Sequence, residues 1–459
     1  MSFTPRLLAL RLLPFRFIPA YVRDVMGELE RQGHSAYAVG GGVRDLVLGR
    51  TPADWDLATS ALPEQIRRLF PRSVPTGIKH GTVTVLSLRP VQVTTYRVER
   101  GYSDHRRPDQ VRFVDDVAED LKRRDFTINS LALDRRGRLI DVVGGLTDLR
   151  LKVVRAVGDA AERFHEDALR MLRAVRFAAQ LGMELDAATW AAIPPLAHLL
   201  GNISAERIRD ELTNMLLTAR PAWAMERLRE SGLLAQFLPE LLEGVGMEQN
   251  VHHAYNVWEH SLVALDAVPA VLRLRLAALL HDVAKPRCLS VSADGARHFF
   301  DHEHVGAGLA RRILKRLKFD NQTVDGVSHL IKHHMALHYQ RQMKDPAIRR
   351  LIKRVGLEHM DDLLRLREAD RKASGKKPGP ISKGTARLLR RIEQVLAQDA
   401  AFGLKDLAID GHDVMTLTGL PPGPEVGRLL RELLEEVLED PSLNTKPALE
   451  ALVRAKVGP

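Results

Sequence analysis

A single cysteine, Cys288, is present in the 459 residues, so the chain cannot form an internal disulfide bond. This excludes disulfide-stapled secreted folds and cysteine-rich zinc modules, and it makes a reducing cytoplasm the expected compartment. No stretch of about 18 uncharged apolar residues occurs, so no membrane-spanning helix is predicted. The N-terminal segment has no acid before Asp24, but Arg11 and Pro14 interrupt its apolar run and no A-x-A site follows. We therefore expect a mature N-terminus that leads into the first helix.

Negative charge is in deficit, because 68 Lys and Arg residues stand against 58 Asp and Glu residues, a formal net charge of +10. Such a balance is expected of a protein that meets polyphosphate, although charge alone does not distinguish nucleic acid from an acidic membrane surface. Apolar residues make up 45% and charged residues 27%, which is ordinary for a globular protein and excludes collagen-like and fully disordered chains.

The order of local patterns predicts an α+β front and a helical remainder. A helix ending near Gly33, a short strand AYAVG and the alternating runs TVTVLSL and VQVTTYRV occupy the first 150 residues, whereas everything after Glu162 has helical spacing. A Lys-, Gly- and Pro-rich stretch, residues 371–384, is expected to be a linker. The expected domains are a head (1–155), a neck (156–245), a middle unit (246–372) and a linker with a helical tail (373–459).

Three glycines, an arginine and two aspartates lie in one short span, AVGGGVRDLVLGRTPADWDLAT, residues 38–59. In a strand, Asp54 and Asp56 would project to the same side. Two neighbouring carboxylates raise the cost of ionising each other, and a divalent cation such as Mg²⁺ removes that cost. The glycines would let a triphosphate approach the backbone, with Arg44 beside it. A tight turn before a solvated strand end is the plain alternative, but it leaves the glycines and Arg44 unexplained.

Residues 40–59 closely resemble the first motif of the class II polymerase-β-type nucleotidyltransferases, the family of tRNA CCA-adding enzymes and bacterial poly(A) polymerases. Four further segments resemble the later motifs of that family in their order and spacing. They are TGIKHGTVTV (76–85), RRDFTINSLALD (123–134), DVVGGLTDLRLKVVRAVGD (141–159) and RFHEDALRMLRAVRFAAQLG (163–182). The resemblance implies a polymerase-β-like head, with a small mixed sheet and helices, followed by an all-α neck, an HD-type middle and a helical tail.

The resemblance also implies the reaction, which is template-free transfer of NMP from an NTP to an RNA 3′-hydroxyl. Asp54 and Asp56 would hold two Mg²⁺ ions. Gly41 and Arg44 would contact the triphosphate and Arg124 the nucleotide. An ion pair between Arg124 and its neighbour Asp125 is the alternative interpretation of that arginine.

Asp167 and Arg170, in the segment EDALR, are three residues apart and are expected on one helix face. A carboxylate accepts from the exocyclic amine of cytosine or adenine, and a guanidinium donates to a ring acceptor, so the pair would pass CTP and ATP and refuse GTP and UTP. In the family these positions act as a protein template, with Arg173 and Arg176 nearby. An i,i+3 salt bridge on a solvated face is the alternative.

One position departs from the family pattern. Gln92, in the strand VQVTTYR, stands where the family usually has an acidic residue that is a candidate third carboxylate. An amide can offer a carbonyl oxygen to a metal, but it cannot take a proton or add charge. Either Asp125 substitutes for the missing carboxylate, or the two motif aspartates suffice.

The middle of the chain resembles the HD phosphohydrolase superfamily. His260, the adjacent pair His281 and Asp282, and Asp370 match its metal-binding pattern, and imidazole and carboxylate ligands suit Mn, Fe, Ni, Zn or Mg. Four further histidines, which could complete or widen the site, are His302, His304, His333 and His334. The predicted activity is 2′,3′-cyclic phosphodiesterase or phosphatase action on RNA ends. A helical scaffold without metal is the alternative.

The tail segment 407–438 joins a Gly/Pro turn, predicted at 423–427, to an amphipathic helix, and is expected to contact RNA unless it is a plain connector. The leading functional hypothesis is a tRNA nucleotidyltransferase that adds CCA from CTP and ATP, with the acceptor and T arms of tRNA on a basic face. An enzyme adding only CC or only A, and a poly(A) polymerase, are close variants. Two hypotheses belong to other functional classes. The chain would be an HD phosphohydrolase with a degenerate transferase head, or an inactive RNA-binding protein. The motifs do not predict an oligomeric state.

Overall fold

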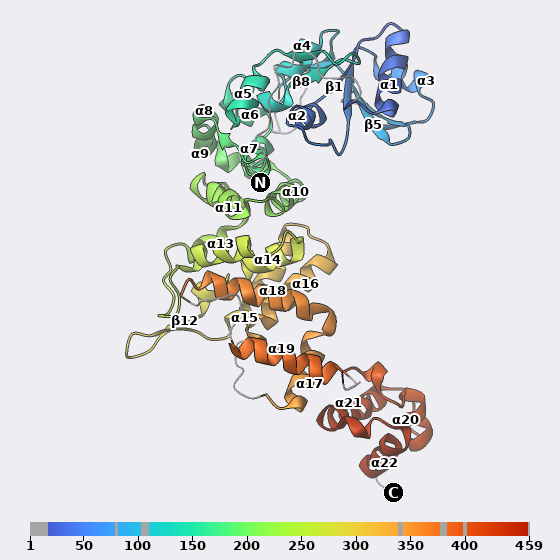
Figure 1. The fold of residues 1–459 in the computed structure, drawn as a ribbon, viewed down its shortest axis with the longest axis vertical. Coiled ribbons are helices and arrows are strands. Elements are labelled where there is room, and N and C mark those ends of the chain that lie inside the picture. Colours follow the sequence, from blue (N-terminus) through green and yellow to red (C-terminus); the bar gives the residue numbers. More distant parts are fainter. Residues whose placement is uncertain are drawn as a thin grey trace. The chain divides into compact units, whose positions relative to one another are not determined.

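In the computed structural model, the described residues are 17–78, 81–101, 110–337, 343–376, 383–397 and 402–457. The chain divides into two compact units, Met1–Pro239 and Glu240–Pro459. The first holds a sheet with flanking helices, coloured blue to green in Figure 1, and the second, coloured yellow to red, is largely helical. The predicted α+β front and largely helical remainder are therefore confirmed, but short strands at 184–185, 289–291 and 297–299 contradict the expectation that everything after Glu162 is helical. The finer division into four domains stays a prediction.

A seven-stranded mixed sheet lies at the centre of the first unit, in the order β3-β4-β5-β2-β1-β8-β9. Among these described strands, only β2 and β5 run parallel to each other. The central strands carry the short apolar runs AYAV, DLAT and LAL, which are mostly buried because neighbouring elements cover them. The strands are β1 (Ala36–Val39), β2 (Asp56–Thr59), β3 (Ser73–Gly77), β4 (Thr82–Leu86), β5 (Pro90–Thr95), β8 (Leu131–Leu133) and β9 (Leu139–Asp141).

Helices pack on this sheet through single apolar stripes. In α1 (Ala20–Arg31), Val22, Val25, Met26 and Leu29 recur at helical spacing and all are buried. The other helices of the unit are α2 (Gly41–Val47), α3 (Pro63–Leu69), α4 (Val117–Lys122), α5 (Gly145–Leu151), α6 (Ala160–Glu166), α7 (Leu169–Leu181), α8 (Ala187–Ala191), α9 (Ile193–Leu196), α10 (Ala205–Leu216), α11 (Pro221–Glu230) and α12 (Leu233–Phe237). Short strand pairs join β6 (Arg97–Arg100) to β7 (Gln110–Phe113) and β10 (Val153–Val154) to β11 (Glu184–Leu185).

Phe177, on α7, packs against one aromatic ring and three guanidinium groups. Its ring meets Phe126 edge to face, with 5.7 Å between the ring centroids. Three guanidinium groups lie over the same ring, at 5.2 Å for Arg44, 5.1 Å for Arg173 and 4.0 Å for Arg176. Because guanidinium groups are attracted to an aromatic face, this ring gathers positive charge from α2 and α7 at one place.

In the second unit, α14 is buried on nearly all sides, since seven of the nine residues in LRLRLAALL are buried. A two-stranded hairpin pairs β12 (Leu289–Val291) with β13 (Arg297–Phe299). None of the helices in the described ranges is long and apolar enough to cross a membrane. The helices are α13 (Val257–Ala267), α14 (Leu272–Leu280), α15 (His302–Arg316), α16 (Asn321–His333), α17 (Asp345–Val355), α18 (Leu357–Ala373), α19 (Lys383–Leu396), α20 (Gly411–Thr418), α21 (Pro424–Glu439) and α22 (Lys446–Val457).

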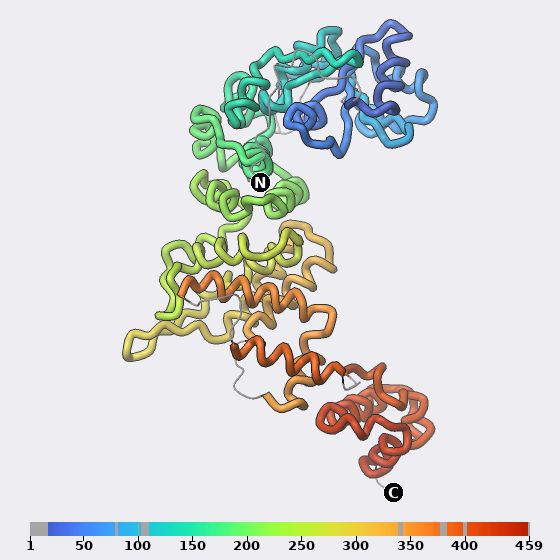
Figure 2. The backbone as a smooth tube through the Cα atoms, in the orientation of Figure 1, coloured from blue at the N-terminus to red at the C-terminus, as the bar shows by residue number. Residues whose placement is uncertain are grey.

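The last three helices, dark red in Figure 2, gather around an apolar cluster of their own that includes Val414, Leu433, Val437 and Leu449. Because α21 already begins at Pro424, the predicted turn at 423–427 is wrong in its extent, and Gly427 lies inside the helix. The turn occupies the residues before Pro424, which can start a helix because its missing N–H has no intrahelical partner there.

Candidate active site

Asp54 and Asp56 lie where the chain enters β2. Only Asp56 belongs to the strand, so the expectation that both aspartates lie in a strand is wrong. Asp54 is exposed in the preceding loop, and the Trp55 side chain between them is buried. Burial, and then the charge of Asp54, raise the pKa of Asp56, while Arg124 acts to lower it. The two carboxylates therefore interact electrostatically, and a cation between them would favour the ionised form of Asp56.

The glycine turn before α2 closes around these aspartates. Gly40 has φ 76° and ψ −141°, a conformation that side chains rarely permit. A Cβ atom on Gly40 would stand 3.2 Å from Nη1 of Arg124 and 3.9 Å from Oδ2 of Asp56. A Cβ atom on Gly42 would stand only 3.0 Å from the carbonyl oxygen of Asp54. Absence of side chains at Gly40 and Gly42 thus allows the turn to lie close to Arg124, Asp56 and the Asp54 backbone.

Arg44 lies behind the turn instead of beside open solvent, and its residue is only 5% exposed. Its guanidinium donates to Asn129 Oδ1 over 2.7 Å and to Asp45 Oδ1 over 2.9 Å. A Cβ atom on Gly41 would stand 3.6 Å from Nη2 of Arg44, so the cation lies directly against the glycine turn. Arg44 therefore holds the turn and adds positive charge beneath it.

A cavity of about 330 Å³ opens next to Asp56. It brings together five residues predicted from the sequence, namely Asp56, Arg124, Asp167, Arg170 and Arg173. Its lining also includes Gln92 and Asp125. Five further lining residues were not predicted from the sequence, namely Thr82, Thr94, Arg97, Arg123 and Arg207. Such a concentration of guanidinium groups beside a carboxylate is suited to binding a polyphosphate.

Asp167 and Arg170 line this cavity but do not share a helix as expected. α6 ends at Glu166 and α7 begins at Leu169, because Asp167 has an extended backbone and its Oδ1 accepts from the Leu169 amide over 3.1 Å. Arg170 donates to Glu166 Oε2 over 2.5 Å. The alternative of a salt bridge between Asp167 and Arg170 is therefore not realised.

Arg207, on α10, forms an ion pair with Asp167. Its guanidinium donates to both carboxylate oxygens, over 3.2 Å to Oδ1 and 2.7 Å to Oδ2. This two-pronged pairing fixes the plane of the carboxylate that faces the cavity. Forty residues separate the two side chains in the sequence, so no local pattern announced the pair.

Both carboxylate oxygens of Asp125 accept hydrogen bonds from other groups of the protein. Arg173 donates to its Oδ2 over 2.6 Å and 2.9 Å, and the Phe126 amide and Asn129 donate to its Oδ1. Burial acts to raise the pKa of Asp125, but Arg173 and Arg170 hold it at about 2. Arg124 pairs with Asp120 over 3.1 Å, so its predicted alternative partner Asp125 is wrong.

With Asp125 occupied in this way, Gln92 is the side chain that flanks Asp56. The parallel strands β2 and β5 place Asp56 and Gln92 opposite each other, and side chains in register project to the same face. Gln92 is exposed and lines the cavity. The Gln92 amide group therefore lies next to Asp56 at the cavity.

Arg176 lies outside this cavity. It donates to Glu211 and to Gln180, the latter over 3.0 Å, and it covers the Phe177 ring. These contacts make Arg176 a packing residue of the helices that support the cavity.

A second polar centre is buried in the second unit. His260, His281 and Asp370 form one group of potential metal ligands, and Asp282, His302 and His334 form another. The Nε2 atoms of His260 and His281 are 3.1 Å apart. The Nε2 atoms of His302 and His334 are 3.3 Å apart. The predicted set is thus assembled, and two of the four additional histidines join it.

The hydrogen bonds of the four rings determine which nitrogen is free. Each Nδ1 lies 2.6–3.0 Å from a backbone carbonyl, which only accepts, so Nδ1 carries a proton and, in the neutral ring, Nε2 is the atom with a free lone pair. Converging lone pairs repel one another unless a cation lies among them. The buried Asp282 Oδ2 accepts no hydrogen bond of acceptable geometry, although Lys285 Nζ lies 2.6 Å away. This donor set fits a divalent metal.

His304 and His333 do not belong to this centre. The side chain of His304 is 58% exposed, and His333 packs its ring on His329 with 4.6 Å between the centroids. The sequence could not separate these two from His302 and His334, because all four lie at helical positions and only the packing of α15 on α16 decides which rings meet.

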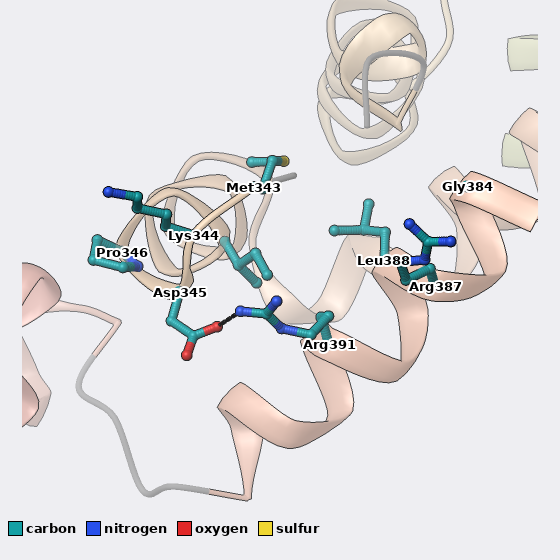
Figure 3. Close-up of a pocket in the computed structure, with 9 residues that line it drawn as sticks. Met343, Lys344, Asp345, Pro346, Gly384, Arg387, Leu388 and Arg391 are labelled. Atoms are coloured by element: carbon teal, nitrogen blue, oxygen red, sulfur yellow. Dashed lines mark hydrogen bonds and ion pairs between the residues drawn. The ribbon is translucent and has the colours of Figure 1, made fainter. Parts of the chain in front are cut away.

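A basic cavity of about 560 Å³ lies between the start of α17 and α19. Figure 3 shows Lys344 and Arg387 at its edges and an ion pair between Asp345 and Arg391 across it. Arg387 is exposed and, among the described residues, makes no ion pair. This surface has the charge and the openness to accept a phosphate.

Three family models match the chain. The model described as "Poly A polymerase head domain" matches residues 36–155, "Probable RNA and SrmB- binding site of polymerase A" matches 182–244, and "tRNA nucleotidyltransferase domain 2 putative" matches 303–453.

Curated relatives match over almost their full length. The chain is 35% identical to the CCA-adding enzyme of Lactiplantibacillus plantarum over 438 residues, 95% of this chain and 96% of that protein. It is 36% identical to the CCA-adding enzyme of Anoxybacillus flavithermus, over 93% of this chain and 94% of that protein.

Solved structures of CCA-adding enzymes have a similar fold. The Bacillus stearothermophilus CCA-adding enzyme in complex with CTP matches with a TM-score of 0.71 and 30% identity, over 95% of this chain and 96% of that one. The Thermotoga maritima CCA-adding enzyme complexed with tRNA matches with a TM-score of 0.57 over 95% of each chain, and its 18% identity supports the fold alone.

Proposed function

The chain belongs to the family of CCA-adding enzymes, and on that premise we propose that Asp54 and Asp56 carry its transfer of CMP and AMP from CTP and ATP to the tRNA 3′ end. The observation that carries this assignment is the position of Asp56 in a cavity whose lining includes six arginines, two residues after Asp54, whose charge helps to raise the pKa of Asp56. Two carboxylates and the Gln92 amide oxygen are hard ligands that suit Mg²⁺. When bound, Mg²⁺ supplies charge stabilisation to the transferred phosphoryl group and lowers the pKa of the attacking hydroxyl.

The remaining groups of the cavity have separate tasks in this proposal. Arg124 contacts the nucleotide, and the glycine turn with Arg44 beneath it receives the triphosphate. Asp167 accepts from the exocyclic amine of cytosine or adenine, and Arg170 donates to the adjacent ring acceptor. Arg207 keeps the Asp167 carboxylate in one plane, so that guanine and uracil meet an acceptor where they present a carbonyl.

Three tRNA transcripts test the reaction, ending at the discriminator base, after one C, or after CC. With Mg²⁺, CTP and ATP, we expect all three to be completed to CCA. Products that stop at CC would assign a CC-adding enzyme, extension of the CC-ended transcript alone an A-adding enzyme, and long A tails a poly(A) polymerase. Absence of any addition would contradict the proposal.

Gly42→Ala tests the glycine turn. A Cβ atom there would press on the Asp54 carbonyl oxygen, which is a backbone atom and cannot move aside alone. Displacing Asp54 by a fraction of an ångström to 1 Å is expected to lower kcat about 100-fold. Gly201→Ala is the matched control, because a Cβ atom on Gly201 meets nothing within 4 Å. Equal rates for the two variants, measured with CC-ended tRNA and ATP, would contradict the role of the turn.

The partner tRNA is proposed to extend its acceptor and T arms over basic surfaces of the chain, including the cavity between α17 and α19. For Arg387→Ala we expect weaker tRNA binding and a salt dependence, log Kd against log salt, that is shallower by about one unit, with an unchanged KM for CTP. Arg365→Ala is the control, since Arg365 already pairs with Asp361 over 2.8 Å. Identical salt slopes for the two variants would remove this surface from the tRNA path.

A second activity is proposed for the HD-type centre, hydrolysis of phosphate esters at RNA ends. The observation that favours it is the set of four Nε2 atoms that converge beside Asp282 and Asp370. Mn, Ni, Fe, Zn or Mg is the expected metal there, held by His260, His281, Asp282 and Asp370, with His302 and His334 as added ligands. When bound, such a metal supplies an activated water at neutral pH. Lys285 lines the same cavity and would add positive charge near the phosphate.

A further inference from the structure

The HD-type centre opens into a cavity of about 300 Å³ within the second unit. One wall is formed by potential metal ligands, among them Asp282, His334 and Asp370. Another wall is the strand β13 and the residue that follows it, which bring His298 and Phe300 to the same cavity. A reactive centre and an aromatic wall thus share one space.

The two rings of this wall are stacked. The His298 and Phe300 planes differ by only 8°, with 5.3 Å between their centroids. Phe300 is 70% exposed, which is a large apolar surface to leave in water. His298 is tethered, since its Nε2 lies 3.3 Å from the Ser292 hydroxyl and it pairs with Ser290 across the hairpin. The stack therefore presents an open, preformed aromatic face.

The stack is also fixed relative to the metal ligands. His302 follows Phe300 by two residues, and Asp301 between them turns the chain with φ 59°. His302 Nδ1 donates to the Phe299 carbonyl over 2.7 Å, which ties the ligand ring to the strand that carries the stack. Movement of the hairpin would therefore displace His302 as well.

Two cations complete the wall. Lys285 Nζ lies 2.6 Å from Asp282 and 5.6 Å from the centre of the Phe299 ring, and Arg297 lines the same cavity. A positive charge between a metal site and an aromatic face suits a molecule that carries a phosphate at one end and a planar ring at the other. Nucleobases stack on aromatic side chains whatever their identity, because every base has a π-face.

We propose that His298 and Phe300 form a stacking platform for the terminal nucleobase of an RNA whose 2′- or 3′-phosphate reaches the HD-type centre, an inference that rests on the hydrolase activity proposed for that centre. The substrate class is therefore a nucleoside phosphate end and not a phosphate ester in general. In the hydrolysis of such an end, the water oxygen bonds to phosphorus and the bond from phosphorus to the ribose oxygen breaks. The ribose oxygen takes the proton, so a hydroxyl end and inorganic phosphate are the products.

The kinetic test compares two substrates, adenosine 2′-monophosphate and glycerol 2-phosphate, which lacks a base. Loss of one base-stacking contact costs about tenfold in affinity. For Phe300→Ala we therefore expect the ratio of KM for the nucleotide to KM for glycerol 2-phosphate to rise about tenfold. Phe300→Trp should keep the ratio of the unaltered chain. Val291→Ala is the matched control, because it removes an apolar side chain, 59% exposed, from the same hairpin without removing a ring.

Binding is tested independently of turnover by saturation-transfer NMR with adenosine on the full-length chain. We expect transfer to the adenine protons to fall in Phe300→Ala and to persist in Val291→Ala. If neither substrate is hydrolysed by the unaltered chain, the proposed hydrolase activity fails, while the NMR comparison still decides the platform. If the two alanine variants give the same KM ratios and the same NMR transfer, the platform is overturned, whether or not hydrolysis occurs.

Discussion

Replacing Asp54 by alanine is expected to abolish addition of CMP and AMP to tRNA and to leave unchanged the phosphate ester hydrolysis proposed for the second unit. The charge of Asp54 acts on Asp56, and without Asp54 one of the two carboxylates proposed to bind Mg²⁺ is lost. Charge stabilisation by a catalytic metal contributes several kcal/mol, and each 1.4 kcal/mol is a factor of ten, so we expect kcat to fall at least about 1,000-fold. The measurement is single-turnover extension of CC-ended tRNA by ATP.

A matched variant separates this effect from damage to the fold. Asp115→Ala removes an exposed aspartate of the same unit and should extend tRNA as the unaltered chain does. Binding of tRNA by Asp54→Ala, measured by filter binding, is expected to persist, because phosphate contacts and not the aspartates carry affinity. Full activity of Asp54→Ala would require a different pair of metal ligands and would contradict the site as assigned.

Replacing Asp282 by asparagine is expected to prevent the HD-type centre from binding metal and to stop the hydrolysis proposed there, with CCA addition retained. Asp282 stands between both histidine pairs, with Oδ2 3.2 Å from His281 Nε2 and Oδ1 3.5 Å from His302 Nε2. Asparagine keeps the volume of the side chain but removes the charge that two groups of ligands share. The metal content of purified protein, loaded with Mn²⁺ or Ni²⁺ and then dialysed, is the direct measurement.

Asp361→Asn is the control for this experiment, since Asp361 is 73% exposed on the helix that also carries Asp370. It should bind as much metal as the unaltered chain. Metal retained by Asp282→Asn at the level of Asp361→Asn would favour the alternative stated from the sequence, a helical scaffold whose histidines have only a structural role.

Much of the transferase cavity could be predicted from the sequence, because the family motifs carry their own order and the resemblance is confirmed over the full chain. The fold class is confirmed for the same reason. Asp56, Arg124, Asp167, Arg170 and Arg173 do line one cavity. Their roles toward a nucleotide stay proposals.

What the sequence could not supply depends on contacts between distant residues. Arg44 is buried because Asn129 accepts from it, 85 residues further along the chain. Arg207 reaches Asp167 from another helix. The helix through EDALR was predicted to be continuous because its periodicity is helical, but capping by Asp167 divides it into two helices. Periodicity reports which face is apolar, and it does not report where a polar side chain competes for the backbone.

The charges gathered around Phe177 have a consequence for an enzyme that acts three times on one RNA end. Each guanidinium over that ring has its own partner, Asn129 for Arg44, Asp125 for Arg173 and Glu211 for Arg176. None of the three is free to swing toward solvent when a product leaves. Arg173 also lines the cavity, so the orientation of its charge there is set during folding and does not have to be set again at each successive nucleotide.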